Sequence, residues 1–389
     1  MDNIKIIKKI GEGAFAECFL CRDYRSKLIA IKRSINEKKY EGIKHSELRE
    51  IYCLVKLRSH PNIIPLYEIS INNNNEYIFI MKYVKYTLDK FVEIYPMKDK
   101  YILSFIRQML SVLYYLEKNE IIHTDIKCNN ILISYNNELD DIHIYLIDFG
   151  SANIENLTER YTVATTYTTR APEVYNYDGN YNSKIDIWSF GMMVYYMIFK
   201  KNYVDHNYFH NKTDVEKLKY IYQIDTNLNN SDMNIKFKYF LLNVLIVDPI
   251  KRPDAKKLIM IFKELYNTDI VIFDEEINKF NESNSSILLK IEKLNKYITS
   301  RLNYINLIKL DVSCSIYNKV SNKLRKSISE IELIFISWFI NYQFTHSNVD
   351  YDLIDFIPVI NSFSGKNYSA RYFCELTYDI LSDINFSLI

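Results

Sequence analysis

Two short stretches constrain this chain more than any other feature. The first reads HTDIKCNN from His123 to Asn130, and the second is Asp148-Phe149-Gly150, which begins eighteen residues after Asn130. Carboxylate and amide oxygens are the hard ligands that Mg²⁺ prefers, and a lysine adds a positive charge that can meet a phosphate. The two stretches together therefore offer side chains that could bind a divalent cation and a phosphate group.

These stretches resemble the catalytic loop and the magnesium loop of protein kinases, which read H-R-D-L-x-x-x-N and D-F-G. The resemblance implies an enzyme that holds ATP, neutralises the triphosphate and orients a hydroxyl group. Asp125 is then the catalytic base, Lys127 contacts the γ-phosphate, and Asn130 and Asp148 bind Mg²⁺. In the families that this chain resembles, a lysine at the place of Lys127 marks Ser/Thr kinases rather than Tyr kinases.

A glycine turn between two predicted strands supplies candidate nucleotide-binding residues. Gly11-Glu12-Gly13-Ala14-Phe15-Ala16 resembles the glycine-rich loop of kinases, with Ala16 at the third glycine position. Small residues let the backbone lie close over phosphates, although such a loop alone also fits an ordinary hairpin turn. Lys32 follows at the expected distance and is the candidate phosphate-anchoring lysine. Its predicted partner is Glu50, and Glu47, one helical turn earlier, is the alternative.

The resemblance implies further nucleotide contacts from the predicted strands. By its register Met81 is the gatekeeper, and the backbone of the hinge, which includes Lys82 and Val84, meets adenine; Cys18 and Ala30 join the same set. A Cys18-x-x-Cys21 pair also allows a zinc site, but no second Cys/His pair with ligand spacing follows. Strand packing is therefore the prediction for this pair of cysteines.

Three later motifs extend the resemblance to about residue 267. Arg170-Ala171-Pro172-Glu173 closes the activation segment that begins at Asp148, and the run DIWSFG from Asp186 matches the helix that braces the catalytic loop. Arg252, within Lys251-Arg252-Pro253, matches a late arginine that pairs with Glu173 in kinases.

The apolar patterns predict an α+β fold, a bilobal protein kinase domain followed by an all-α domain. Strands are expected over residues 4–10, 15–20, 28–32, 63–71 and 77–83, and helices over 44–58 and 101–118. The expected domains are a strand-rich N-lobe (1–84), a helical C-lobe (85–270), a linker (271–286) and an all-helical domain (287–389).

Two features place the chain near the cyclin-dependent kinases. Lys44-His45-Ser46-Glu47-Leu48-Arg49-Glu50-Ile51 resembles their cyclin-binding helix, and Arg170 before Ala-Pro-Glu is typical of that branch and its proline-directed relatives. Two features depart from the branch. The region between Asp214 and Asp248 is too short for its usual insert, and Thr168-Thr169 replaces a common Trp-Tyr pair.

Thr124 stands where the kinase pattern has an arginine. In cyclin-dependent kinases three arginines grip a phosphothreonine, and here Arg49 matches the first while Thr124 and Asn153 replace the others. One arginine is a poor cradle for a charge of about −2. We therefore hypothesise that activity does not depend on phosphorylation of the activation segment, where Thr162 holds about the phosphorylated position.

The region 287–389 resembles a cyclin box in pattern. Residues 352–356, Tyr368 and 380–388 are similar to its closing half, with 333–344 as the buried central helix. A generic helical extension packed on the kinase is the alternative. A cyclin-like region would press on the 44–58 helix and seat Glu50 against Lys32 from within the chain, whereas an external cyclin would otherwise be the expected partner.

Composition limits the remaining classes. A net charge of +1, from 49 basic and 48 acidic residues, argues against nucleic-acid or membrane partners. The kinase resemblance implies protein substrates with Ser or Thr. Six scattered cysteines and the lack of a signal-type or membrane-spanning run predict an intracellular, reducing compartment: cytoplasm, nucleus, or the host cell of a virus.

The contrasting functional class is a pseudokinase that acts as a nucleotide-binding scaffold. Thr124 and Ala16 are the departures that favour it. The presence of Lys32, Asp125 and Asn130, together with Asp148, favours an active enzyme that uses ATP and Mg²⁺.

Overall fold

The chain forms two compact units, which are described separately. In the computed structural model the first contains the described residues of 1–56 and 65–83 with Tyr372 and Leu376, and the second those of 57–64 and 84–274. The structure describes residues 4–13, 16–35, 45–71, 77–154, 166–176, 181–204, 209, 211–272, 372 and 376. The predicted helical domain over 287–389 therefore lies outside the described residues, apart from Tyr372 and Leu376.

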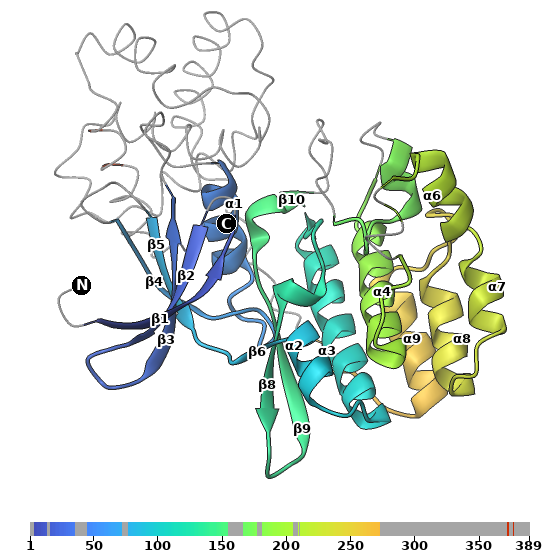
Figure 1. Ribbon diagram of the computed structural model, residues 1–389, viewed down its shortest axis with the longest axis horizontal. Helices are drawn as coiled ribbons and strands as arrows, with labels where there is room; N and C mark the ends of the chain where they lie inside the picture. The colour runs from blue at the N-terminus through green and yellow to red at the C-terminus, as the bar shows by residue number, and fades with distance from the viewer. Residues whose placement is uncertain are drawn as a thin grey trace, which may run out of the picture. The chain divides into compact units, whose positions relative to one another are not determined.

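The first unit is a five-stranded antiparallel sheet in the order β1-β2-β3-β5-β4 with one helix beside it (Figure 1). Its elements are β1 (Lys5–Glu12), β2 (Ala16–Arg22), β3 (Leu28–Ser34), α1 (His45–Lys56), β4 (Leu66–Ile71) and β5 (Tyr77–Lys82). Alternation of side chains gives the sheet two apolar faces. One face carries a cluster formed by Cys21, Ile29, Ile78 and Ile80.

The other face of the sheet packs against α1. Ile51 of this helix joins Ile69, Tyr77 and Phe79, each at most 5% exposed. The strands and the helix of the sequence analysis are thus confirmed, although their bounds differ by up to three residues; β4, predicted from residue 63, begins at Leu66. The helix ends at Lys56 instead of residue 58, because turns closed by backbone hydrogen bonds from His60 to Leu57 and from Ile63 to His60 take over.

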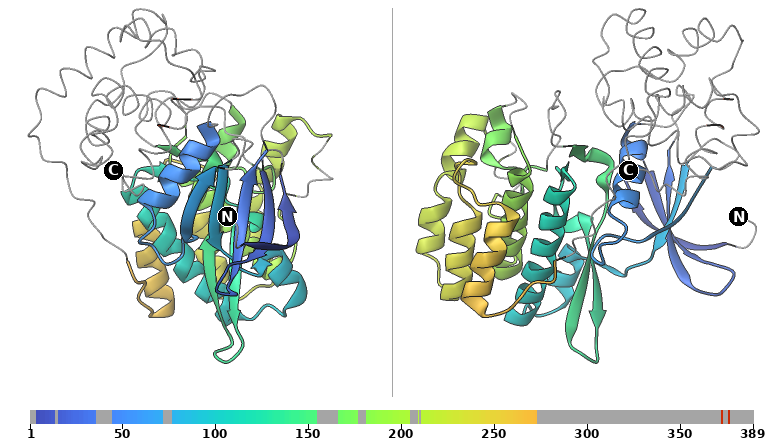
Figure 2. Two further views of the ribbon diagram at one scale, coloured as in Figure 1. Left: turned by 90° about the vertical axis from the view of Figure 1, so that its left-hand side faces the viewer. Right: turned by 180° about the vertical axis from the view of Figure 1, so that it is seen from behind.

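The second unit is mainly helical (Figures 1 and 2). Its helices are α2 (Leu88–Ile94), α3 (Asp99–Lys118), α4 (Lys184–Phe199), α6 (Asp214–Ile221), α7 (Ile224–Asn229), α8 (Ile235–Val244) and α9 (Ala255–Tyr266), with 3₁₀ turns η1 (Cys128–Asn130), η2 (Phe149–Ser151) and η3 (Pro172–Asn176). A row of buried aromatic rings, Phe105, Phe190, Phe240 and Phe262, joins α3, α4, α8 and α9, with successive centroids 6.1 to 6.2 Å apart. This row forms the centre of the core.

The last helix of the second unit has sequence-encoded ends. Asp254 caps α9 by accepting the N–H of Lys257 at 2.8 Å. Asn267 then adopts the left-handed conformation, with φ of 49°, and its N–H donates to the carbonyl of Lys263. Helix α9 thus ends next to the residue near which the resemblance to kinases stops in the sequence.

Short strands frame the catalytic loop. β6 (Tyr86–Thr87), β8 (Ile131–Asn136) and β9 (Asp141–Leu146) form one small sheet, and β7 (Ile121–Ile122) pairs with β10 (Asn153–Ile154). None of these strands was predicted from the sequence; β6, β7 and β10 have only two residues each and therefore show no periodicity. Residues 123–127 of the catalytic loop lie between β7 and η1, so these two elements fix both ends of the loop.

Among the described parts of the chain, no helix has both the length and the apolar character needed to cross a membrane.

Candidate active site

A buried carboxylate of α4 fixes the backbone of the catalytic loop. Asp186, 2% exposed, accepts the backbone N–H of His123 at 2.6 Å and that of Thr124 at 2.9 Å. A buried carboxylate requires such donors, and the two bonds in turn set the path of the loop. The expectation that the Asp186 helix braces the catalytic loop is confirmed.

The carboxylate of Asp125 is held by three side chains. Lys127 Nζ lies 2.6 Å and Asn130 Nδ2 3.2 Å from Oδ2, while Thr166 Oγ1 donates to Oδ1 at 2.8 Å. Asp125 is 9% exposed, so these contacts restrict it to a narrow range of orientations. A carboxylate oriented in this way is suited to accept a proton from an incoming hydroxyl. The sequence analysis brought these residues together except Thr166, which nothing distinguishes from the other threonines between residues 162 and 169.

Asn130 and Asp148 offer oxygen atoms of the kind that Mg²⁺ requires. Asn130 uses its amide nitrogen toward Asp125, whose carbonyl it meets at 2.8 Å, so its amide oxygen is the group left for a cation. Asp148 adopts a left-handed backbone, with φ of 65°, immediately before η2. Within the described residues no three or more His, Cys, Asp or Glu side chains gather to hold a metal. The oxygen atoms of Asn130 and Asp148 would suit a divalent cation whose coordination phosphate oxygens complete.

His123 supports the magnesium loop as a neutral ring. Its Nδ1 accepts the N–H of Asp125 at 3.2 Å, and Nε2 lies 3.0 Å from the carbonyl oxygen of Ile147. The ring packs edge-on against Phe149, with centroids 4.8 Å apart. Complete burial lowers the pKa of His123 below its ordinary value, so the imidazole stays uncharged and acts as a fixed spacer.

The first unit contributes the candidate phosphate-anchoring lysine. Lys32 Nζ lies 2.6 and 2.7 Å from the two carboxylate oxygens of Glu50. The two side chains are 18% and 4% exposed, so the pair is largely shielded from water. The structure thus selects Glu50 over Glu47 as the partner of Lys32, as the sequence analysis preferred.

Five of the predicted nucleotide-binding residues of this unit share one face of the sheet. Residues directly opposite each other in antiparallel strands lie on the same face. The pairs are Gly11 with Cys18, Cys18 with Lys32, and Ala30 with Met81. This is also the α1 face, because Met81 packs against the cluster that contains Ile51.

The remaining nucleotide candidates differ in what the structure shows of them. Ala14 and Phe15 lie outside the described residues, and Ala16 begins β2. Among the described residues, a Cβ added at Gly11 or Gly13 meets no atom closer than 3.6 Å, so packing against them does not require glycine there; close approach of a ligand would.

Three further candidates complete the set. Glu12 is exposed and pairs with Lys9 at 2.7 Å, which places its carboxylate in solvent. The N–H of Lys82 donates to the carbonyl of Pro65 at 3.1 Å, and Val84 is 9% exposed.

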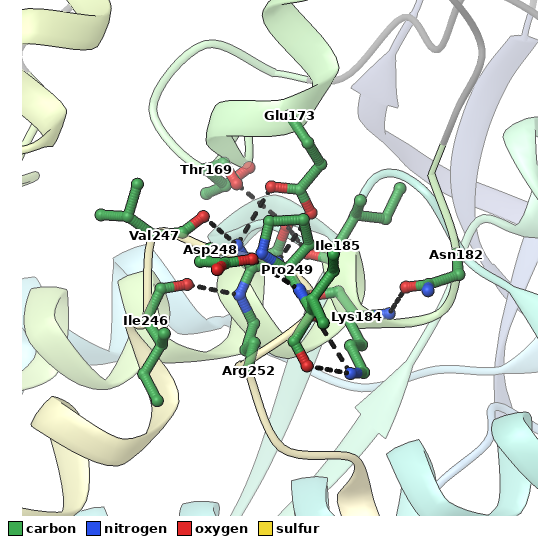
Figure 3. A network of polar contacts seen from close by, with 12 residues as sticks. Thr169, Glu173, Asn182, Lys184, Ile185, Ile246, Val247, Asp248, Pro249 and Arg252 are labelled. Carbon is green, nitrogen blue, oxygen red and sulfur yellow. Dashed lines mark hydrogen bonds and ion pairs between the residues drawn. The ribbon is translucent and has the colours of Figure 1, made fainter.

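A buried ion pair joins the end of the activation segment to the segment that precedes α9, within the second unit (Figure 3). Arg252 contacts Glu173 through both terminal nitrogens, at 2.7 and 3.0 Å, and also donates to the carbonyls of Ile246 and Lys184, both at 2.8 Å. Its side chain is 0% exposed. The predicted pairing is confirmed, and it fixes the segment that carries Thr166.

Comparison with known proteins agrees with this arrangement. The family model for the protein kinase domain matches residues 4–261. Calcium-dependent protein kinase 4 of Plasmodium falciparum is 34% identical over 208 residues, which cover 51% of this chain and 37% of that protein. Cyclin-dependent kinase G-2 of Oryza sativa subsp. indica is 29% identical over 231 residues, covering 57% of this chain and 31% of the relative.

Two further similarities concern proteins that are named as CTD kinases. A probable CTD kinase subunit alpha homolog of Encephalitozoon cuniculi is 28% identical, covering 58% of this chain and 64% of its own length. A chain in the crystal structure of the yeast RNA Pol II CTD kinase CTDK-1 complex shares the fold, with a TM-score of 0.55, 20% identity and coverage of 66% of this chain and 90% of that one.

These similarities have a defined extent. The chain spans between about a third and two thirds of the length of the curated relatives named here. Cyclin-dependent kinases are among them, in agreement with the residues of α1 and the Arg170 motif. Because the family model matches residues 4–261, which is most of the chain, the chain belongs to the protein kinase family.

Proposed function

We propose that this protein transfers the γ-phosphoryl group of ATP to serine or threonine hydroxyls of protein substrates, with Mg²⁺. The observation that carries the proposal is the carboxylate of Asp125, which is fixed by Lys127 at 2.6 Å and by Thr166 at 2.8 Å. A scaffold that only binds nucleotide has no use for a carboxylate oriented in this way. The relatives at 29 to 34% identity that are named as protein kinases support the same class.

Each of the held side chains has a distinct task in the proposed reaction. Asp125 accepts the proton of the substrate hydroxyl, and Lys127 balances negative charge beside it. Asn130 and Asp148 hold Mg²⁺, which neutralises charge on the phosphates. Lys32, kept in place by Glu50, meets the nucleotide phosphates. Gly11 to Ala16, with Cys18, Ala30, Met81, Lys82 and Val84, form the nucleotide-binding set in this proposal.

Substitution of the proposed base tests the function. Asp125→Asn keeps the size of the side chain and removes its basicity, so transfer of phosphate to a Ser/Thr peptide is expected to fall by about 10²- to 10⁴-fold. Asp232→Asn is the matched control, because Asp232 is exposed on a loop of the second unit. Equal activity of the Asp125→Asn variant and the parent protein would contradict the assignment. Absence of transfer in the parent itself would favour the nucleotide-binding scaffold.

Arg170 bears on which residue the substrate carries after the phosphorylated serine or threonine. Arg170 resembles the arginine of proline-directed kinases, and its guanidinium lies over the ring of Tyr167 at 4.4 Å and that of Tyr175 at 5.3 Å. Thr168 and Thr169 depart from the pattern of that branch. We propose a preference for Ser/Thr-Pro sites, to be tested by comparing a Ser-Pro peptide with the same peptide carrying Ser-Ala.

We further propose that the C-terminal region acts on α1 in the manner of a cyclin. Two observations support this. Leu376 is 4% exposed and groups with the unit that contains α1, and α1 carries Glu50, which must be seated against Lys32. Covalent attachment would raise the effective concentration of such a region to about millimolar for a short linker. An external cyclin would then not be required.

Truncation separates this regulatory proposal from the catalytic one. Residues 1–274 and the full-length protein are compared in phosphate transfer, and 275–389 is then added back as a separate chain. Lower activity of the truncated protein, restored by the added chain, is the expected result. Full activity of residues 1–274 alone would overturn the cyclin-like role and leave the kinase assignment intact.

A further inference from the structure

We propose that Thr124 is a positioning residue whose hydroxyl ties the magnesium loop to the catalytic loop, so that this tie requires no phosphate group. The inference rests on the proposed function, because it assigns a means of regulation to the same site. It concerns the position at which the kinase pattern has an arginine and this chain has a threonine.

Thr124 connects three parts of the second unit. Its N–H donates to Asp186 Oδ1 of α4 at 2.9 Å, and its Oγ1 donates to the carbonyl of Ser151 at 2.8 Å. Ser151 ends η2, three residues after Asp148. The contacts therefore run from α4 through the catalytic loop to the segment that carries the proposed Mg²⁺ ligand. Thr124 is 2% exposed, so the hydroxyl bond is shielded from competing water.

The backbone at Thr124 makes this arrangement specific. Its φ is 69°, in the left-handed region that β-branched residues rarely adopt. Such a conformation persists when the surrounding structure fixes it, here through Asp186. The side chain therefore leaves the loop in one direction and presents its hydroxyl to Ser151.

Asn153, which replaces another arginine of the kinase pattern, also bonds to neighbouring groups of the fold. Asn153, at the start of β10, pairs with Ile122 of β7, and its amide donates to the hydroxyl of Tyr181 at 2.5 Å. Arginines at these two positions would need an anion to balance them. The hydroxyl and the amide instead bond to neutral groups of the fold, so the link between the loops is complete before any modification.

Two substitutions of the same residue isolate the hydroxyl. Thr124→Val keeps the branched shape and removes the donor, whereas Thr124→Ser keeps the donor. Thr268→Val is the matched control, because Thr268 Oγ1 also donates to a backbone carbonyl, that of Tyr266 at 3.1 Å, after the end of α9. The full-length protein is used throughout.

The first measurement is hydrogen–deuterium exchange of the segment 148–154 in nucleotide-free protein, and the second is the Mg²⁺ concentration that half-saturates binding of a non-hydrolysable ATP analogue. Thr124→Val removes one hydrogen bond. We therefore expect it to raise both the exchange rate of the segment 148–154 and the half-saturating Mg²⁺ concentration by about three- to tenfold. Thr124→Ser and Thr268→Val are expected to stay within about twofold of the parent.

The remaining outcomes decide against the proposal or separate it from the function. Parent-like values for Thr124→Val, or equal damage in Thr124→Ser, would overturn a role for the hydroxyl. We expect the parent protein to keep its activity after phosphatase treatment. Loss of that activity would show that the protein requires phosphorylation and would overturn this part of the proposal. If the parent transfers no phosphate while the exchange difference persists, the proposed function fails and the tie stands.

Discussion

Single charged residues fix the geometry of each unit. Glu50 lies against Lys32 in the first, and Asp186 and Arg252 lie against backbone and side-chain partners in the second. Burial makes these contacts strong, because a charge shielded from water cannot replace a lost partner with solvent. Substitutions at these residues are therefore expected to have larger effects than substitutions of the exposed pairs, such as Lys90–Glu93.

The Lys32–Glu50 pair gives a prediction for catalysis. Glu50→Gln keeps the shape of the side chain but removes the charge that holds Lys32, so kcat/KM for ATP is expected to fall by about 10- to 100-fold. Steady-state kinetics with ATP as the varied substrate measures this. Glu47→Gln, on the same helix one turn earlier, is the comparison. A larger loss for Glu47→Gln than for Glu50→Gln would contradict the pairing.

The Arg252–Glu173 pair gives a prediction for stability. Arg252→Lys cannot donate to two carboxylate oxygens and two carbonyls at once, and it leaves buried acceptors unmet. A loss of about 3 kcal/mol is expected, which corresponds to a drop of about 10 °C in the unfolding midpoint of a unit of this size. Arg25→Lys, at an exposed turn, is the control. A change below about 2 °C in the Arg252 variant would refute this view of the network.

At the scale of elements, a buried relay anchors the segment after α9 to α3. The N–H of Asn62 donates to His60 Nδ1 at 3.1 Å, and this assigns the ring proton to Nε2, which lies 3.1 Å from Ser111 Oγ. The Ser111 hydroxyl in turn donates to the carbonyl of Val271 at 2.7 Å. The relay requires a neutral imidazole, and it holds the backbone at Val271 against α3.

This relay predicts a pH dependence of stability. Burial lowers the pKa of His60 from 6.5 to about 4. Below pH 6.5 the unfolded chain binds a proton that the folded chain does not bind until about pH 4, so stability falls as the pH falls through this window. The full effect is about 3 kcal/mol.

Thermal unfolding at pH 7 and pH 5 measures the effect. His60→Gln cannot titrate, so its midpoint is expected to fall by several degrees less between the two pH values than that of the parent. His143→Gln serves as the control, because His143 is more exposed than His60. An equal fall in the parent and the His60 variant would show that His60 does not titrate in this window.

The strands and helices differ in whether the sequence alone could predict them. Strands β1 to β5 and helix α3 were predictable, because each is long enough to display its period of 2 or 3.6 residues. The two-residue strands β6, β7 and β10 were not, because they form through partners distant in sequence. In the site, the motif residues were predictable from their spacing, whereas Thr166 meets Asp125 only through folding of a segment 41 residues away.

At the scale of the whole molecule, the proposed chemistry depends on both units. The lysine–glutamate pair and the glycine turn belong to the first, while the base and the Mg²⁺ ligands belong to the second. Phosphate transfer thus requires residues of both units, whereas the exchange and unfolding experiments concern residues of one unit at a time. This division makes an activity measurement the most demanding test of the account.

The most direct test is transfer of labelled phosphate from ATP to a Ser-Pro peptide and to a generic basic protein substrate by the full-length protein with Mg²⁺. Asp148→Asn, which removes a proposed Mg²⁺ ligand while keeping the side chain's size, provides the blank. The account predicts label on serine or threonine with the parent protein and loss of about 100-fold or more with the variant. Label at the level of the blank with the parent protein would contradict its central claim.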